Sequence, residues 1–195
     1  MDEREFFDRI APDWDVNETM STPERVNKIL DFMNIKEGQS VLDLGTGTGV
    51  LLPYLAERVC VTGRITAVDY SEGMLGEARK KFGNLIPTPL FENKDIENDT
   101  IEGEFDRIIL YCVYPHLHEP VETLKWLKRV NLKPEGKIFI AFPCSEEFIN
   151  NIHKERHSDS DELPSAEKLM SYLCDNGFNA KTVSATDKSY VISIE

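Results

Sequence analysis

The stretch Val41-Leu-Asp-Leu-Gly-Thr-Gly-Thr-Gly-Val50 decides the fold that the sequence predicts. Residues 40–44 are apolar enough for a buried strand, and three alternating glycines follow where that strand turns into a helix over residues 50–59. Glycine has no Cβ, so the backbone can turn sharply and a ligand can approach it closely. A tight turn that binds nothing is the plainer interpretation, but single glycines are enough for such a turn. The stretch therefore indicates a ligand-binding turn inside an α/β sheet.

Helical and strand-like segments alternate along the rest of the chain. Residues 23–34 place apolar side chains on one helical face, with Thr22 as the capping residue. Ser71 and Ser165 are expected to cap two further helices, and residues 121–130 to form another. Strands are expected at residues 64–69, 90–92, 105–111, 137–142, 178–185 and 189–194, with a turn at 131–136. The last two strands are close enough to form a hairpin, so the pattern predicts βαβ units that end in an antiparallel pair, a three-layer α/β fold.

Length and composition favour one compact domain over residues 1–195. The chain is 41% hydrophobic, which is enough for a core. Its net charge of −13 argues against a nucleic-acid substrate, because an acidic surface repels phosphate. The apolar runs are too short to cross a bilayer, and the N-terminus lacks the order of a secretory signal. The four cysteines form no CxxC pair, so we expect a cytoplasmic protein with reduced thiols and no metal site.

Three acidic residues follow or end predicted strands. Asp43 precedes the first glycine by two residues, where it disfavours a pyrophosphate and suits a cationic ligand. Asp69 ends the second strand and can accept both hydroxyls of a ribose. Asp95 and Ile96 follow the third strand and suit the amine and the face of an adenine, although a solvated loop carboxylate is the alternative. An NAD-dependent oxidoreductase also stays open, but the dinucleotide fingerprint needs a glycine where this chain has Val50.

These segments resemble the motifs of class I methyltransferases that use S-adenosylmethionine (SAM). The similarity is carried by residues 41–50, 66–74, 95–96 and 132–136. The opening Phe6-Phe-Asp-Arg-Ile-Ala-Pro-Asp-Trp14 resembles that of the ubiquinone/menaquinone methyltransferase branch. The resemblance implies a Rossmann-like sheet of seven strands, mostly parallel with the last strand antiparallel. One departure is Glu135, where the family often has a glycine, and we expect that change to affect stability more than chemistry.

The resemblance also implies that the cofactor is SAM and indicates which side chains surround it. Asp43 and the glycine turn are expected to hold the methionine part, and Asp69 the ribose. Met74, Asp95 and Ile96 are expected around the adenine. The full set of cofactor residues that we expect is Asp43, Gly45, Thr46, Gly47, Gly49, Asp69, Tyr70, Ser71, Met74, Asp95, Ile96 and Tyr111.

The methyl acceptor is expected at the carboxyl ends of the strands, where ligands of open α/β sheets bind. Tyr114 and His116 follow the fourth strand, and His153 lies in the long segment after the fifth. We interpret residues 143–164 as a cap and residues 1–21 as a lid, and we expect His116, His153 and Tyr114 to form the catalytic side of one pocket. A core aromatic is the equal alternative for Tyr114.

The sequence therefore predicts a SAM-dependent methyltransferase with a small-molecule acceptor. The acceptor is left open: a phenol or a carbon acid needs a base such as His116 or His153, whereas a thiol, an amine or a metalloid needs none. A non-catalytic SAM-binding protein remains an alternative. Neither a nucleic-acid partner nor a membrane span is expected, and a homodimer is left open.

Overall fold

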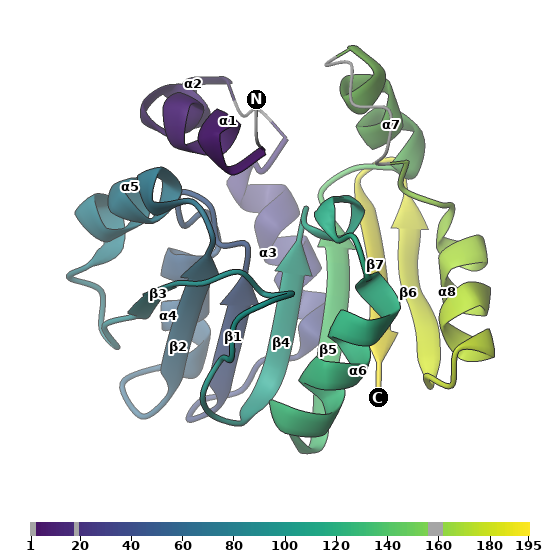
Figure 1. Cartoon of the computed structure of the whole chain (residues 1–195). Helices are drawn as coiled ribbons and strands as arrows, with labels where there is room; N and C mark the ends of the chain where they lie inside the picture. The colour runs from purple at the N-terminus through teal and green to yellow at the C-terminus, as the bar shows by residue number, and fades with distance from the viewer. Residues whose placement is uncertain (1–2, 18–19, 156–161) are drawn as a thin grey trace.

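A computed structural model describes residues 3–17, 20–155 and 162–195, apart from the side chains of residues 17, 153 and 155. Within these residues lies a seven-stranded sheet with the strand order β3-β2-β1-β4-β5-β7-β6 (Figure 1). The strands are β1 (Ser40–Leu44), β2 (Arg64–Asp69), β3 (Leu90–Asn93), β4 (Phe105–Tyr111), β5 (Leu132–Phe142), β6 (Ala180–Thr186) and β7 (Ser189–Ile194). The pairings from β3 to β5 are parallel, whereas β7 is antiparallel to β5 and β6. The predicted mostly parallel sheet with an antiparallel last strand is confirmed.

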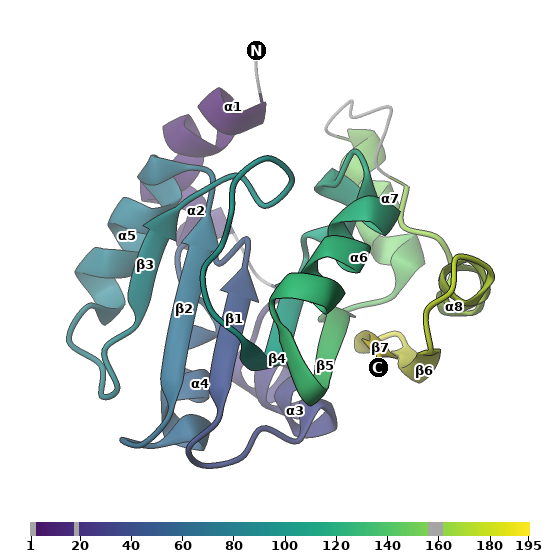
Figure 2. The ribbon, with the colours of Figure 1, turned by 60° about the horizontal axis from the view of Figure 1, so that its bottom comes forward.

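Helices cover both faces of this sheet. They are α1 (Glu3–Ile10), α2 (Trp14–Asn17), α3 (Pro23–Met33), α4 (Leu52–Val59), α5 (Glu72–Phe82), α6 (Pro120–Val130), α7 (Glu146–Glu155) and α8 (Ala166–Asp175), with the 3-10 turns η1 (Ala11–Asp13) and η2 (Tyr114–His116). The apolar faces of α3 and α4 pack against one side, and those of α6 and α8 against the other (Figure 2). Because both faces of the sheet are covered, β1 and β7 are buried at every residue.

Two of the predicted helix caps form as expected. The Thr22 hydroxyl oxygen accepts the N–H of Arg25 at 3.4 Å, and the Ser71 hydroxyl oxygen accepts the N–H of Met74 at 3.1 Å. Ser165 occupies the capping position of α8, but its side chain makes no capping hydrogen bond, so that part of the prediction is wrong. The positions of these three helices were nevertheless predicted, because the apolar face decides the position of a helix more strongly than the cap does.

One helix begins later than predicted, and another lies in a segment whose form the sequence had left open. The helix predicted over residues 50–59 begins at Leu52, because the glycine turn continues with a hydrogen bond from the Leu52 N–H to the Gly49 carbonyl at 3.0 Å. The segment 143–164 contains the helix α7 within its described part, a form that the sequence had left open.

The fifth strand begins earlier than predicted. Phe105 of β4 pairs with Leu132, but Arg107 pairs with Lys137, so the residues between these two partners on β5 bulge out of the ladder. The sequence had predicted a turn over residues 131–136 and a strand only from 137. Glu135 lies in this bulge with a φ of 64°, a left-handed conformation that favours glycine.

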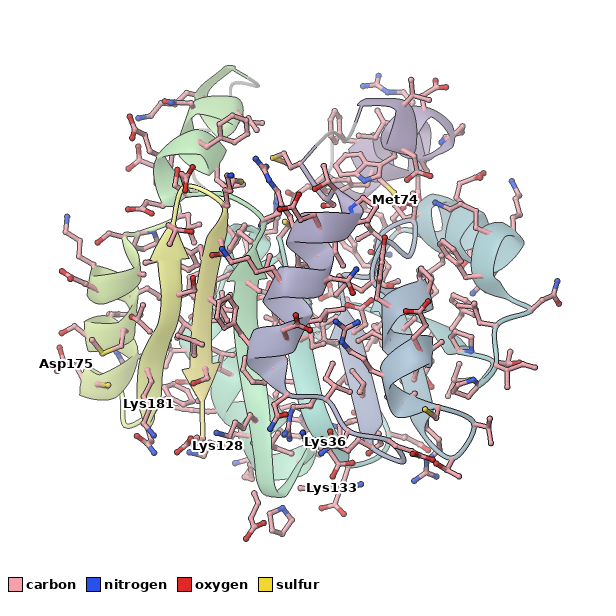
Figure 3. All side chains as sticks on the ribbon, turned by 180° about the vertical axis from the view of Figure 1, so that it is seen from behind. Lys36, Met74, Lys128, Lys133, Asp175 and Lys181 are labelled. Atoms are coloured by element: carbon pink, nitrogen blue, oxygen red, sulfur yellow. The ribbon has the colours of Figure 1, made fainter. Side chains whose placement is uncertain are left out.

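The five parallel strands, β1 to β5, end at one edge of the sheet, which we call the carboxyl edge. Their last residues are Leu44, Asp69, Asn93, Tyr111 and Phe142. Helices α1 and α2 lie over this edge beside α5, and α7 stands at the same edge further along the sheet (Figure 1). Met74 lies at this edge beside the N-terminal helices, whereas the labelled Lys36, Lys128, Lys133 and Lys181 lie at the opposite edge (Figure 3). These lysines are therefore far from the predicted site.

Candidate functional site

The turn between β1 and α4 is built from glycines with positive φ angles. Gly45, Gly47 and Gly49 have φ angles of 65°, 56° and 88°. A Cβ on Gly45 would lie 2.4 Å from Cγ2 of Val113, so this glycine lets the loop after β4 pack closely against the turn. A Cβ on Gly47 would meet nothing within 4 Å. The turn thus leaves open space beside its backbone where the sequence predicts a ligand.

Asp69 ties this turn to the end of β2. Its Oδ2 accepts the N–H of Gly47 at 2.8 Å, and its Oδ1 accepts the N–H of Ser71 at 2.9 Å. The residue is only 6% exposed, and burial raises the pKa of Asp69 to about 6 against the opposing effect of these hydrogen bonds. Each carboxylate oxygen has a second lone pair, so Asp69 can still accept hydrogen bonds from a diol.

Asp43 is a second buried carboxylate at the same edge. It is 1% exposed, and its Oδ2 accepts the hydroxyl of Thr46 at 2.7 Å. Burial raises the pKa of Asp43 to about 7, and the charge of Asp69 acts in the same direction. Two neighbouring buried carboxylates favour a ligand that brings positive charge and hydroxyl donors. SAM has an ammonium group, a sulfonium group and a ribose diol, so the residues present fit this cofactor.

Three further predicted cofactor residues lie just after β2, in the first turn of α5 and at the end of β4. Met74 of α5 is 2% exposed. The ring of Tyr70 packs against Phe7 of α1 with centroids 6.1 Å apart. Tyr111 ends β4, is 6% exposed, and donates its hydroxyl to Oγ of Ser21 at 2.9 Å. Their contacts to a cofactor stay predictions.

Asp95 lies in a tight turn after β3. Its Oδ1 accepts the N–H of Glu97 at 2.9 Å, and its Oδ2 accepts a side-chain N–H of Asn98 at 2.9 Å. The neighbouring Ile96 packs partly buried against the core that α6 covers. These hydrogen bonds stabilise the turn that contains Asp95, which agrees with the alternative of a loop carboxylate. Its role toward an adenine stays a prediction.

The N-terminal helices bind the carboxyl edge through contacts that the sequence did not predict. Three carboxylates of this segment each contact a different loop at the carboxyl edge. The pairs are Asp15 Oδ1 with the Thr48 hydroxyl at 2.6 Å, Asp8 Oδ1 with the Ser71 hydroxyl at 2.6 Å, and Glu3 Oε1 with Nδ1 of His116 at 2.6 Å. The three loops follow β1, β2 and β4. The acidic residues were visible in the sequence, but no local pattern names partners that lie so far away along the chain.

Aromatic rings fix the same segment. Phe7 packs against Trp14 with centroids 5.9 Å apart and against His116 with centroids 5.8 Å apart, in addition to Tyr70. Phe6 lies beside Phe7 at 5.5 Å. The N-terminal aromatics thus pack against the carboxyl edge, over the loops that follow β2 and β4.

The three predicted catalytic residues are placed differently. His116 lies at the carboxyl edge in the loop after β4, and its Nδ1 contacts Glu3 of α1. Tyr114 is 6% exposed within the core that includes Tyr190, and burial raises the pKa of Tyr114 to about 12, so it follows the alternative of a core aromatic more closely. His153 belongs to α7, but its side chain lies outside the described residues. The convergence of His116 and His153 on one pocket stays a prediction.

Among the residues that the structure describes, no helix is long and apolar enough to span a membrane. No group of three or more histidine, cysteine, aspartate or glutamate side chains is arranged there to hold a metal ion.

Known proteins share this sequence pattern. A family model described as a methyltransferase domain matches residues 35–184. A 2-phytyl-1,4-naphtoquinone methyltransferase from Nostoc sp. is 30% identical over 176 residues, which cover 85% of this chain and 76% of that protein. A demethylmenaquinone methyltransferase from Symbiobacterium thermophilum is 30% identical over 154 residues, which cover 74% of this chain and 60% of that protein.

A solved structure shares the fold. The crystal structure of a SAM-dependent methyltransferase from Aquifex aeolicus has a TM-score of 0.73 at 24% identity, over 100% of this chain and 98% of that one. The chain spans between 33% and 76% of the length of the first three curated relatives that it matches. The matched residues 35–184 include the glycine turn and both buried carboxylates. The chain therefore belongs to the methyltransferase-domain family, as a class I SAM-dependent methyltransferase of the quinone-methyltransferase-like kind.

Proposed function

We propose that this enzyme transfers the methyl group of SAM to the ring of a small hydroxylated aromatic molecule of the quinol type, in the cytoplasm. The observation that carries the proposal is the imidazole of His116, in the loop after β4. This loop packs closely against the glycine turn at Gly45, and Phe7 contacts both His116 and Tyr70, the residue after Asp69. A phenolic acceptor needs a base, because its oxygen must lose a proton before the ring becomes nucleophilic. Two relatives are named for a naphthoquinone and for demethylmenaquinone, which supports this class of acceptor.

The chain's own residues are proposed to orient the cofactor. We assign the amino-acid part of SAM to Asp43 and the glycine turn, the ribose to Asp69, and the adenine to Met74, Asp95 and Ile96. When bound, SAM supplies a methyl group on a positively charged sulfur, whose leaving group is already activated. The protein then contributes by aligning the acceptor and excluding water. The match to the methyltransferase-domain family argues against the NAD-dependent oxidoreductase that the sequence had left open.

The proposed reaction moves one methyl group and releases one proton. The acceptor hydroxyl gives its proton to Nε2 of His116, and the electron pair of the oxyanion is delocalised into the ring. Bound SAM would supply the methyl group to a ring carbon, and the bonding pair of the broken C–S bond would remain on sulfur. Loss of the proton from that carbon, with return of a proton to the oxygen, restores the aromatic ring.

We also propose that residues 1–21 form a lid and residues 143–164 a cap, within one methyltransferase domain over residues 1–195. The carboxylate and aromatic contacts of α1 and α2 at the carboxyl edge support the lid. The position of α7 at the same edge supports the cap (Figure 1). A role for His153 opposite His116 depends on this cap.

Methyl transfer to 1,4-naphthalenediol tests the proposal, under anaerobic conditions and with SAM labelled in its methyl group. We expect labelled 2-methyl-1,4-naphthalenediol and an equal amount of S-adenosylhomocysteine. His116→Ala should lower this turnover by roughly 100-fold, the usual contribution of a general base, and leave the SAM affinity unchanged. Unchanged turnover in His116→Ala would contradict the role of this base. Binding of SAM without transfer to the diol or to any fraction of a metabolite extract would instead favour a SAM-binding protein without turnover.

A further inference from the structure

Helix α1 places a carboxylate against the proposed base. Glu3 Oε1 lies 2.6 Å from Nδ1 of His116, and the two side chains are 37% and 28% exposed. Phe7, which lies one turn further along α1, packs its ring edge-to-face on the imidazole with an interplanar angle of 82°. Two contacts of the imidazole, one with a carboxylate and one with an aromatic ring, therefore come from the same N-terminal helix.

The contact of Glu3 with His116 has a chemical consequence. An ionised carboxylate can only accept a hydrogen bond, so in the neutral imidazole the proton lies on Nδ1 and the lone pair lies on Nε2. A histidine whose Nδ1–H binds a carboxylate is held in the tautomer that lets Nε2 take up a proton. The carboxylate also stabilises the imidazolium that forms.

We propose that Glu3 is a positioning residue for His116, and that the base is assembled only when α1 is docked on the carboxyl edge. The inference rests on the proposed function of His116 as the base. Two other carboxylates of the segment, Asp8 and Asp15, contact the loops that carry Ser71 and Thr48. Docking of α1 and α2 therefore covers the loops that follow β1 and β2 and brings Glu3 to His116. Methyl transfer should then follow this docking.

A second histidine offers a matched control. His118 Nδ1 lies 3.1 Å from Glu97 Oε2, and the Glu97 carboxylate also accepts the backbone N–H groups of His118 and Glu119. This pair has the same kind of contact, but both partners come from loops of the sheet and neither comes from α1. The side chain of His118 is 85% exposed. A substitution that alters the tautomer of His116 but not that of His118 therefore acts through α1.

The tautomer can be read without any acceptor, from long-range proton–nitrogen NMR spectra of the ¹⁵N-labelled full chain. The spectra are recorded at pH 8.5, where an ordinary histidine with a pKa of about 6.5 is neutral. We expect His116 in the Nδ1–H form in the parent protein and largely in the Nε2–H form in Glu3→Ala. Glu97→Ala should change His118 and spare His116, and Glu5→Ala, an exposed change on the same helix, should spare both. An Nε2–H tautomer of His116 in the parent, or His116 signals unaffected by Glu3→Ala, would overturn the inference.

Kinetics with 1,4-naphthalenediol separate a positioning role from a structural one. Glu3→Ala should lower kcat by about 10- to 100-fold, within the range of general-base catalysis, with a SAM Kd within twofold of the parent. Glu3→Asp should recover part of that loss. In a His116→Ala background, Glu3→Ala should cause no further loss of kcat, because the two residues act as one unit. A further loss in that background would overturn the inference. If His116→Ala alone keeps full activity, the proposed base is wrong, while the tautomer measurement still decides whether Glu3 orients the ring.

Discussion

The affinity for SAM should fall as the pH falls below 7, because of Asp43. Burial raises the pKa of Asp43 to about 7, and a cationic amino group binds well only to the ionised carboxylate. Cofactor binding should therefore lower this pKa and release a proton when the solution lies below pH 7. At pH 6 about one molecule in ten has Asp43 ionised, so the Kd should be roughly tenfold larger than at pH 8, or about 1.4 kcal/mol.

Calorimetric titration with SAM between pH 6 and 8.5 measures this effect, in buffers of different ionisation enthalpy that also report the protons released. Asp43→Asn is the matched control, since it removes the titrating group and keeps the size of the side chain. Its Kd should be weaker and should change by no more than about twofold over this range, which is the effect of Asp69 alone. The pKa of Asp69, raised to about 6, should steepen the fall below pH 6. A parent Kd that stays constant from pH 6 to 8.5, with no proton release, would refute the reasoning.

Three further predictions concern the same edge of the sheet. Asp69→Ala should weaken SAM binding by about 1.5–3 kcal/mol in calorimetry at pH 8, because hydrogen bonds to a charged group have about that strength. Deletion of residues 1–20 should leave the sheet folded by circular dichroism but lower the SAM affinity, and normal binding and turnover would contradict the lid. Gly45→Ala should lower the free energy of unfolding in urea more than Gly47→Ala, because its Cβ would lie 2.4 Å from Val113, whereas at Gly47 only the φ angle of 56° opposes a side chain, at a cost of about 1–2 kcal/mol. Equal losses would show that the loop after β4 yields to the new methyl group.

Local side-chain chemistry was enough to predict most of the fold. Residues 40–44 and 64–69 are apolar runs of strand length, and both became strands with the predicted bounds. Thr22 and Ser71 are capping residues followed by apolar helical faces, and both start helices. The bulge at Glu135 was missed, because the pairing of Leu132 with Phe105 is a contact between distant segments that no short pattern encodes.

The candidate site was predictable on the cofactor side and less so on the acceptor side. Asp43 and Asp69 stand at strand ends, so the parallel topology alone brings them to one edge. The contacts of Asp8 and Glu3 depend on how an N-terminal helix docks on loops of the sheet, which is decided by tertiary packing. Tyr114 could not be assigned from sequence, because a tyrosine after a strand serves equally well as a pocket wall or as a core side chain.

Titration of the full chain with SAM and, separately, with NAD measures the central claim most directly. The claim is that the glycine turn with its two buried carboxylates holds a cationic adenosyl cofactor. Calorimetry should show binding of SAM with a micromolar Kd, about −8 kcal/mol, and no binding of NAD. Asp43→Asn should weaken the SAM signal without creating one for NAD. Binding of NAD without binding of SAM would contradict the account.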